Sequence, residues 1–150
     1  MRRKDREISK EETMQLLNNC EYGVLSTITQ NGEPYGVPLS YCVVDNSIYF
    51  HSALEGKMLD CIQNNNIASF CVVGNTEILQ NKFSTNYESV IVFGIIEEAN
   101  EIDKQIGLEG LINKYSPNFI PEGIKYIDNA KDETKVLKLK IINLSGKARK

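Results

Sequence analysis

The stretch Tyr22–Val44, YGVLSTITQNGEPYGVPLSYCVV, decides how this chain folds. It joins two runs of β-forming residues through Asn31-Gly32, a dipeptide typical of a tight hairpin turn with positive φ at both central positions. In the second run the odd-numbered residues are large and share one face, whereas Gly36, Pro38 and Ser40 share the other. Pro38 cannot donate a ladder hydrogen bond, so it indicates a sheet edge or a bulge. The stretch therefore predicts an antiparallel hairpin with one face of small residues.

The rest of the chain also favours short antiparallel strands. Further strands are expected at residues 47–51, 67–74, 83–99 and 134–144, with a loop or edge at 75–81 and a bend near Asn86. Helices are expected at residues 10–19, from just after Ser52 to about residue 65, at 103–115, and for a turn or two at 123–130. Few connections are long enough for parallel crossovers, and no repeat or linker divides the chain. We predict one domain over residues 1–150, a mainly β Greek-key or meander barrel with peripheral α-helices.

Composition excludes several classes of partner. The chain has 17 basic and 20 acidic residues, a net charge of −3 that argues against nucleic-acid binding. The basic ends, residues 1–6 and 146–150, are interpreted as solvated tails. The N-terminus lacks the apolar core of a signal peptide, and no apolar run approaches the roughly 20 residues of a membrane span. Four cysteines in no ligand spacing, with a single histidine, predict a cytoplasmic protein without metal site or disulfide.

The only histidine lies in Tyr49–Met58, YFHSALEGKM, where a strand is expected to give way to a helix. The sequence from Ser52 to Glu55 is a capping-box pattern, which predicts a helix that begins directly after Ser52. The first turn of a helix binds anions, Gly56 allows a close approach, and Lys57 adds a positive charge. These residues predict a phosphate site, with His51 facing the group to which the phosphate is attached, while the small-residue face of Pro38 and its neighbours could support a planar ring.

A purely structural interpretation stays open at this point, because capping boxes are common and a histidine at a strand end is often only hydrogen-bonded. The stretch also ends like a P-loop, GxxxxGK[ST]. However, His51 replaces its first glycine and Met58 replaces its serine or threonine. This excludes a nucleotide hydrolase of that kind.

Three motifs in this order resemble the pyridoxamine 5′-phosphate oxidase-like flavoproteins, and most of all their nitroimidazole-resistance (Nim-type) branch. They are GEPYGVPLSY at 32–41, IYFHSALEGKMLD at 48–60 and YESVIVFG at 87–94, and the similarity extends over nearly the whole chain. The resemblance implies a Greek-key split β-barrel that forms a homodimer, with FMN in two equivalent clefts at the subunit interface.

The resemblance also implies a set of residues that line or border the flavin ring: Pro38, Leu39, Ser40, Tyr41, His51, Ser52 and Ala53. Gly56 and Lys57 would hold the phosphate. Tyr87 and Ser89, which match the third motif, would reach the cleft from the partner or support its wall.

The function that the resemblance implies is an FMN-dependent oxidoreductase that passes electrons from a reduced donor to a small aromatic acceptor such as a nitroimidazole. His51 would be catalytic, as a proton donor, because an imidazole changes protonation near neutral pH. The absence of a second basic cluster outside the tails argues against vitamin B6 oxidation. Two alternatives remain: a non-enzymatic flavin-binding or redox-sensing module, and a split barrel that binds haem or a deazaflavin, with His51 as the sole imidazole ligand.

Overall fold

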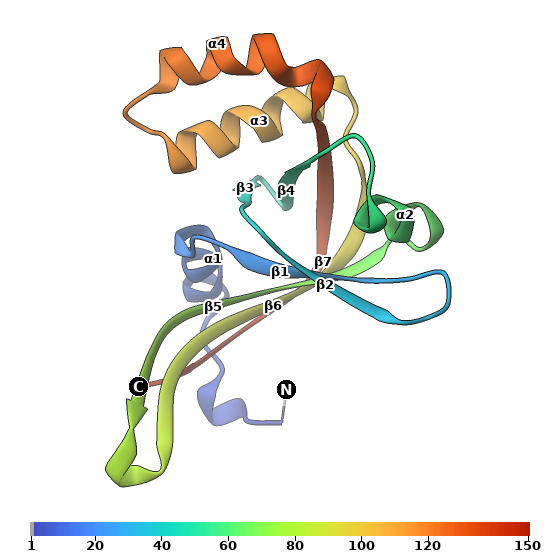
Figure 1. The fold of residues 1–150 in the computed structure, drawn as a ribbon. Coiled ribbons are helices and arrows are strands. Elements are labelled where there is room, and N and C mark those ends of the chain that lie inside the picture. Colours follow the sequence, from blue (N-terminus) through green and yellow to red (C-terminus); the bar gives the residue numbers. More distant parts are fainter. Residues whose placement is uncertain (1) are drawn as a thin grey trace.

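The computed structural model describes residues 2–150, and in this part of the chain seven antiparallel strands form one curled sheet (Figure 1). The strands are β1 Gly23–Ile28, β2 Pro34–Leu39, β3 Cys42–Val44, β4 Ser47–Ser52, β5 Ile67–Leu79, β6 Ser84–Glu98 and β7 Lys135–Arg149. Their order in the sheet is β2-β1-β5-β6-β7-β4-β3. β2 and β3 are consecutive in sequence but lie at opposite edges, so the sheet curls into a half-barrel. The predicted mainly β split-barrel class is confirmed.

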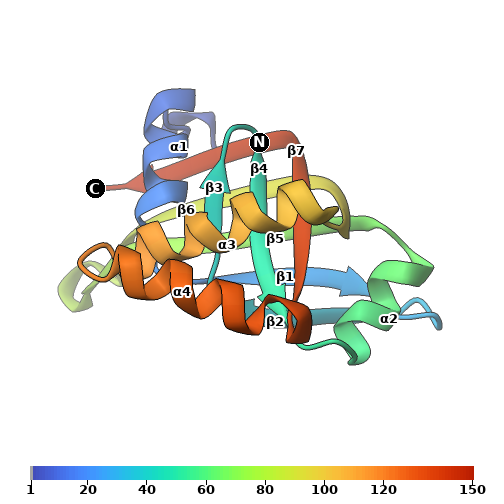
Figure 2. The same cartoon turned by 90° about the horizontal axis from the view of Figure 1, so that it is seen from above.

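The helices lie around this sheet. They are α1 Lys10–Asn19, α2 Lys57–Asn64, α3 Glu101–Tyr115 and α4 Ile120–Ala130, with short 3₁₀ helices η1 Lys4–Arg6, η2 Gln80–Lys82 and η3 Lys131–Glu133. Figure 2 shows α3 lying across β3, β4 and β7, with α4 packed beside it. These two helices therefore cover the outer face of the sheet over β3, β4 and β7, whereas no helix covers it over β1, β2, β5 and β6. None of the described helices is long and apolar enough to cross a membrane.

The main core fills the inside of the barrel. Alternate residues of each strand point inward, and α1 and α2 add Leu17 and Leu59 to the same cluster. Phe70 lies at its centre, in edge-to-face contact with Tyr41 at 4.7 Å and with Phe50 at 5.1 Å between ring centroids. Leu137, Leu139 and Ile141 of β7 are buried on the face that the sequence predicts.

Two glycines allow α3 to approach the sheet closely. A Cβ atom on Gly107 would come within 2.8 Å of Tyr49 and 2.9 Å of Val136. One on Gly110 would lie 2.7 Å from the sulfur of Cys42. These residues lower helix propensity, as the sequence indicates, but packing of α3 against β3, β4 and β7 requires them.

The hairpin between β1 and β2 forms as predicted, but its turn differs. The N–H of Gly32 donates to the carbonyl of Thr29, and the N–H of Thr29 donates to the carbonyl of Glu33, both at 2.9 Å. Only Gly32, with φ of 81°, has positive φ in this loop. The expected pair of positive-φ residues is therefore wrong, because the connection has one more residue and places only its last in the left-handed region.

Residues 75–79, expected as a loop or an edge, continue β5 and pair with β6 alone, so they form an edge of the sheet, with a register shift between Val73 and Thr76 near the expected bend. Two other predictions are wrong. Helix α4 has 11 residues where one or two turns were expected, since Pro121 at its start is compatible with the first turn. The basic C-terminus is not a solvated tail, because β7 continues to Arg149 and Lys147 pairs with Glu7 near the N-terminus.

Candidate functional site

His51 lies on the wall of an apolar cavity between the sheet and the two long helices. In β4, Ile48 and Phe50 point into the barrel core, and His51 lies on the opposite face, beneath α3 and α4. The cavity has a volume of about 180 Å³. Its wall consists of His51 with mostly apolar residues of α3 and α4 and residues that follow α4: Leu108, Leu111, Ile112, Tyr126, Ile127, Ala130, Lys131 and Thr134.

The size and lining of this cavity indicate what it can hold. An apolar cavity of roughly 150 Å³ holds one benzene ring, and pockets for drug-sized ligands begin at about 300 Å³. The cavity beside His51 therefore fits a single small aromatic ring, with the imidazole, Lys131 and Thr134 as polar groups on its wall. The sequence predicts a helix at 103–115 but contains no signal that its residues would face His51.

The junction after β4 is built differently from the sequence prediction. Helix α2 begins at Lys57, and Gly56 is its N-cap residue with no side-chain cap. Ser52 does not cap a helix, because its hydroxyl donates to the carbonyl of Ala53 at 3.0 Å. The reason is Gly56, whose φ of 148° is outside the helical region and is readily adopted only by glycine. The predicted helix start after Ser52 is therefore wrong.

This arrangement leaves donors available at the start of α2. The first N–H groups of the helix have no side-chain acceptor from Gly56, and a Cβ atom on Gly56 would meet nothing within 4 Å. The ammonium of Lys57 lies 4.7 Å from the ring centroid of Tyr35, and the lysine itself is exposed. The exposed loop that contains Ala53 leads into this turn. The free N–H groups, the open glycine and the lysine together fit a phosphate group.

The segment from Pro38 to Tyr41 divides between surface and core. Pro38 and Ser40 are exposed, and Leu39 is half-buried and packs against the core. Tyr41 is fully buried, and its hydroxyl donates to the carbonyl of Leu17. Its side chain is therefore held in the core and is not available to a ligand at the surface.

Tyr115 fixes the backbone at this corner. The N–H of Tyr41 donates to the Tyr115 hydroxyl at 2.9 Å, and that hydroxyl is shared between the carbonyl oxygens of Tyr41 and Glu21. Pro38 and Ser40 are thus presented by an edge strand whose end is anchored to α3.

Tyr87 and Ser89 lie far from His51 within one chain. His51 pairs with Val136 on β7, whose neighbour Leu137 pairs with Glu98 at the end of β6. Tyr87 is near the start of β6, so the path along the strand from Glu98 is about 35 Å at 3.3 Å per residue. Figure 1 shows the start of β6 on the hairpin that extends away from α2. These two residues can join the others only if a second chain supplies them.

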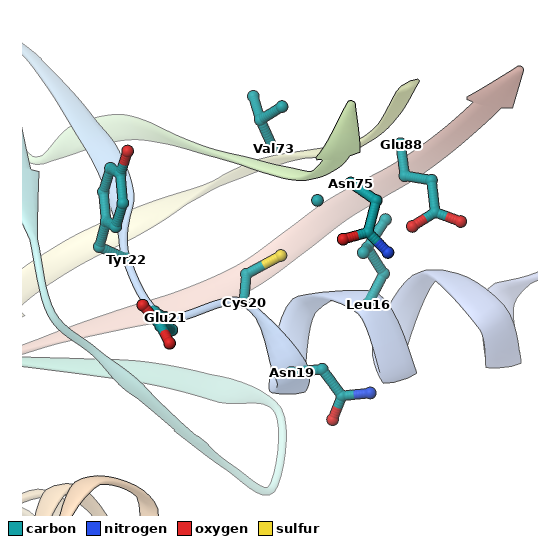
Figure 3. A pocket seen from close by; sticks show the side chains of 9 residues that line it. Leu16, Asn19, Cys20, Glu21, Tyr22, Val73, Asn75 and Glu88 are labelled. Carbon is teal, nitrogen blue, oxygen red and sulfur yellow. The ribbon is translucent and has the colours of Figure 1, made fainter. Parts of the chain in front are cut away.

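A larger cavity, of about 450 Å³, lies between α1 and the β5–β6 hairpin and contains none of the predicted site residues. Figure 3 shows Leu16 and Cys20 of the α1 side facing Asn75 and Glu88 from the strands.

Burial raises the pKa of the Cys20 thiol, and it raises that of Cys42 to about 12. These thiols therefore stay protonated and are poor nucleophiles. Within residues 2–150 no three potential metal ligands cluster.

The chain is similar to a known protein family and to several solved structures. The family model of pyridoxamine 5′-phosphate oxidase matches residues 9–148. A candidate 5-nitroimidazole antibiotic resistance protein of Bacteroides thetaiotaomicron has a similar structure, with a TM-score of 0.81, 21% identity, and coverage of 95% of this chain and 86% of that one. An FAD and haem binding protein of Mycobacterium smegmatis has a TM-score of 0.82, 18% identity, and coverage of 97% and 74%.

A third similar structure is an FAD-binding protein of Mesorhizobium loti, with a TM-score of 0.71, 22% identity, and coverage of 97% of this chain and 98% of that one. No curated protein is similar enough in sequence to be matched. At these identities the solved structures establish the shared fold.

Proposed function

The chain belongs to the pyridoxamine 5′-phosphate oxidase family, and on that premise we propose that it is a homodimeric, FMN-dependent oxidoreductase that reduces a small aromatic acceptor of the nitroimidazole type. One observation carries the proposal: His51 lines an apolar cavity that fits one aromatic ring, six residues before the start of α2, whose N-terminus has no side-chain cap and fits a phosphate. The solved relatives support it as well, because two of them bind FAD and a third is a candidate nitroimidazole resistance protein.

The residues that would hold FMN are those around the start of α2 and the adjacent edge strand. Lys57 and the first N–H groups of α2 would bind the phosphate, while Pro38, Ser40 and Ser52 would border the ring. When bound, the flavin supplies the electron-transfer chemistry, and the protein supplies binding, orientation and electrostatics. Tyr41 would contribute through the position of its backbone, since its side chain is in the core.

The chain's own contribution to the reaction is to orient the acceptor and to supply a proton. The apolar walls from α3 and α4 would place a flat ring beside His51 of β4. The imidazole of His51 can donate a proton to a polar substituent of that ring. Lys131 and Thr134 also line the cavity and can contact such substituents.

The bare outer face of the sheet supports the homodimer. It carries large apolar side chains that are between 38% and 60% exposed: Val24, Ile67, Val73, Ile91, Phe93 and Ile95. Strand pairing joins them into one surface, since Ile67 lies opposite Ile95 and β1 pairs with β5. A second copy on this face would cover the patch and bring its Tyr87 and Ser89 towards the first chain's site.

The haem alternative fits the cavity less well. One solved relative binds both FAD and haem, and His51 is the sole imidazole of this chain. A haem macrocycle is much larger than one aromatic ring, and the cavity beside His51 has a volume of about 180 Å³.

The other alternative is a flavin-binding or redox-sensing module without turnover. An assay of nitroimidazole turnover separates it from the oxidoreductase. The four cysteines are free, and we propose the reducing cytoplasm as the location of the protein.

The first experiment is the visible spectrum of the purified protein, followed by turnover of a nitroimidazole with NADH or NADPH. We expect a flavin spectrum and turnover in the wild type. His51→Ala should keep FMN bound and lower kcat by about 10²- to 10⁴-fold, because it removes a proton donor. Lys57→Ala should weaken FMN binding by about 10- to 100-fold, because it removes a charged hydrogen bond to the phosphate.

Lys10→Ala is a matched control, since Lys10 is also an exposed first residue of a helix, α1, whose N-terminus Ser9 already caps. It should leave flavin binding unchanged. A colourless protein that does not bind added flavin contradicts the proposal. Flavin binding without turnover on any nitroaromatic supports the redox-sensing module instead.

A further inference from the structure

The cavity beside His51 exists because α4 lies close to α3 at one end and carries a small side chain at the other. Gly123, Ile127 and Ala130 follow one another at helical spacing and share one face of α4, on which the first two are buried. A Cβ atom on Gly123 would overlap the Cγ2 methyl of Ile112 and come within 3.0 Å of its Cδ1 atom. Gly123 therefore lets α4 contact α3 directly and holds the side chain of Ile112 in place between the two helices.

Ala130 leaves the hollow at the other end of this face. It lies on the last turn of α4, seven residues after Gly123, and contributes only a methyl group to the cavity wall. The other apolar wall residues are all larger: Leu108, Leu111, Ile112, Tyr126 and Ile127. An unfilled apolar space lowers the stability of a protein, so a longer side chain at position 130 would be the more stable choice. The chain keeps the space open beside its only histidine.

The cavity is accessible to a ligand from solvent. His51 and Tyr126 are the two exposed residues of its wall, and Tyr126 is 70% exposed. The remaining wall residues are buried or half-buried. A ring can therefore enter beside His51 and Tyr126, whereas Ile112 and Ala130 lie deeper and limit how far it can extend.

The volume of about 180 Å³ only slightly exceeds the roughly 150 Å³ of an apolar cavity that holds benzene. We propose that Ile112 and Ala130 determine which aromatic acceptors the protein takes, because they admit one ring and exclude two fused rings. This inference rests on the proposed function, in which an aromatic acceptor binds beside His51. It adds the size of that acceptor and the two residues that set it.

Ring binding can be measured without turnover. His51 is the only histidine, so its imidazole gives a single set of signals in an NMR spectrum of the full chain. Nitrobenzene and 1-nitronaphthalene carry the same substituent on one ring and on two fused rings. In titrations without an electron donor, nitrobenzene should shift the His51 signals of the wild type. 1-Nitronaphthalene should bind at least about tenfold more weakly, because a hydrophobic pocket rejects a group for which it has no room.

Ala130→Leu should fill the cavity. Nitrobenzene binding should weaken at least about tenfold, because the leucine occupies the space of the ring. The midpoint of urea unfolding should rise, because the cavity is filled. Asn129→Leu is the matched control, since it adds the same side chain at the neighbouring exposed position of α4, and it should leave nitrobenzene binding unchanged. A merely structural role of Ala130 would change the unfolding midpoint and leave ring binding as it is.

Ile112→Ala should have the opposite effect and enlarge the cavity. It should bind 1-nitronaphthalene at least about tenfold more tightly than the wild type does, a gain that a misfolded variant cannot show. Ile124→Ala, which truncates a half-buried isoleucine of α4 outside the cavity wall, should show no such gain.

Two results would overturn the inference: equal binding of the two compounds by the wild type, or unchanged nitrobenzene binding in Ala130→Leu. Ring binding that follows these variants in a protein without turnover supports the inference and contradicts only the proposed oxidoreductase activity.

Discussion

Lys114, near the C-terminal end of α3, is a buried cation without a hydrogen-bond partner. Its ammonium lies 3.6 Å from the ring centroid of Tyr41, and its nitrogen is shielded from solvent. Loss of hydration lowers its pKa, and the neighbouring Cys42 and Cys20 only partly oppose this shift. The ring face of Tyr41 offsets part of the cost of burying the charge. The sequence contains no signal for this residue, because its neighbours come from three separate segments.

The lowered pKa of Lys114 predicts how stability depends on pH. Between the folded-state pKa and the ordinary value of about 10.4, the unfolded chain binds more protons than the folded one. The free energy of unfolding should therefore rise with pH across that window. Lys114→Met should remove this rise, and urea unfolding of both proteins from pH 7 to pH 10.5 measures it. Parallel pH profiles would contradict the prediction, since all other groups cancel in the difference between the two proteins.

At the scale of elements, two serines with the same sequence pattern behave differently. The hydroxyl of Ser9 accepts the N–H of Glu12 at 3.1 Å, and the carboxylate of Glu12 accepts the N–H of Ser9 at 2.9 Å. Ser52 has a glutamate three residues later as well, but it is the last residue of β4 and caps nothing. The pattern predicts a cap only where the following residues can become helical, and Gly56 prevents that after Ser52.

Alanine substitution should separate the two serines. Ser9→Ala should lower the free energy of unfolding by about 1 kcal/mol, because it removes the cap of α1. Ser52→Ala should change it by less than about 0.5 kcal/mol. Chemical denaturation of the two variants and the wild type tests this directly. A loss of about 1 kcal/mol in Ser52→Ala would mean that α2 is capped from Ser52 after all.

Elements whose residues alternate or repeat regularly could be predicted from the sequence, and those decided by contacts distant in sequence could not. The strand at residues 134–144 has a clear inner face, and α1 has a capping box, so both are confirmed. The extension of β5 through residues 75–79 has no apolar alternation and depends on pairing with β6. The roles of Gly107 and Gly110 depend on β3, β4 and β7, which are distant in sequence.

The candidate site shows the same division. The sequence predicts an anion site at Gly56 and Lys57 because glycine, a positive charge and a helix start are adjacent there, and the structure does begin α2 at Lys57. It does not identify the cavity at His51, whose other walls follow 57 or more residues later. It also misses that the two basic ends lie side by side, because the bridge between Glu7 and Lys147 joins segments 140 residues apart in sequence. The assignment of the flavin-binding residues remains a prediction.

At the scale of the whole molecule, the bare outer face predicts the oligomeric state. Phe93 is 54% exposed at the middle of this apolar surface. Phe93→Asp should raise the dissociation constant of the dimer at least about 100-fold, because it would place an unpaired charge in an apolar interface. Sedimentation velocity measures this, and flavin binding should be lost together with the dimer if Tyr87 and Ser89 come from the partner.

Ile102→Asp is the matched control for the interface. Ile102 is 75% exposed on α3, which covers the other half of the outer face, so its substitution should leave the dimer intact. A wild type that sediments as a monomer, or a Phe93→Asp variant that still dimerises, would show that this face is not the interface.

The tie between Tyr41 and Tyr115 also has a consequence for how the chain reaches its native state. The two residues are 74 positions apart, yet the hydroxyl of one holds the corner at which the backbone passes from one sheet edge to the other. A contact over such a span carries a large loop-closure cost and is made only after α3 has docked. We therefore expect β5, β6 and β7 to pair early in folding and the two sheet edges to come together last. On unfolding, the contact between the two edges should then be the first to open.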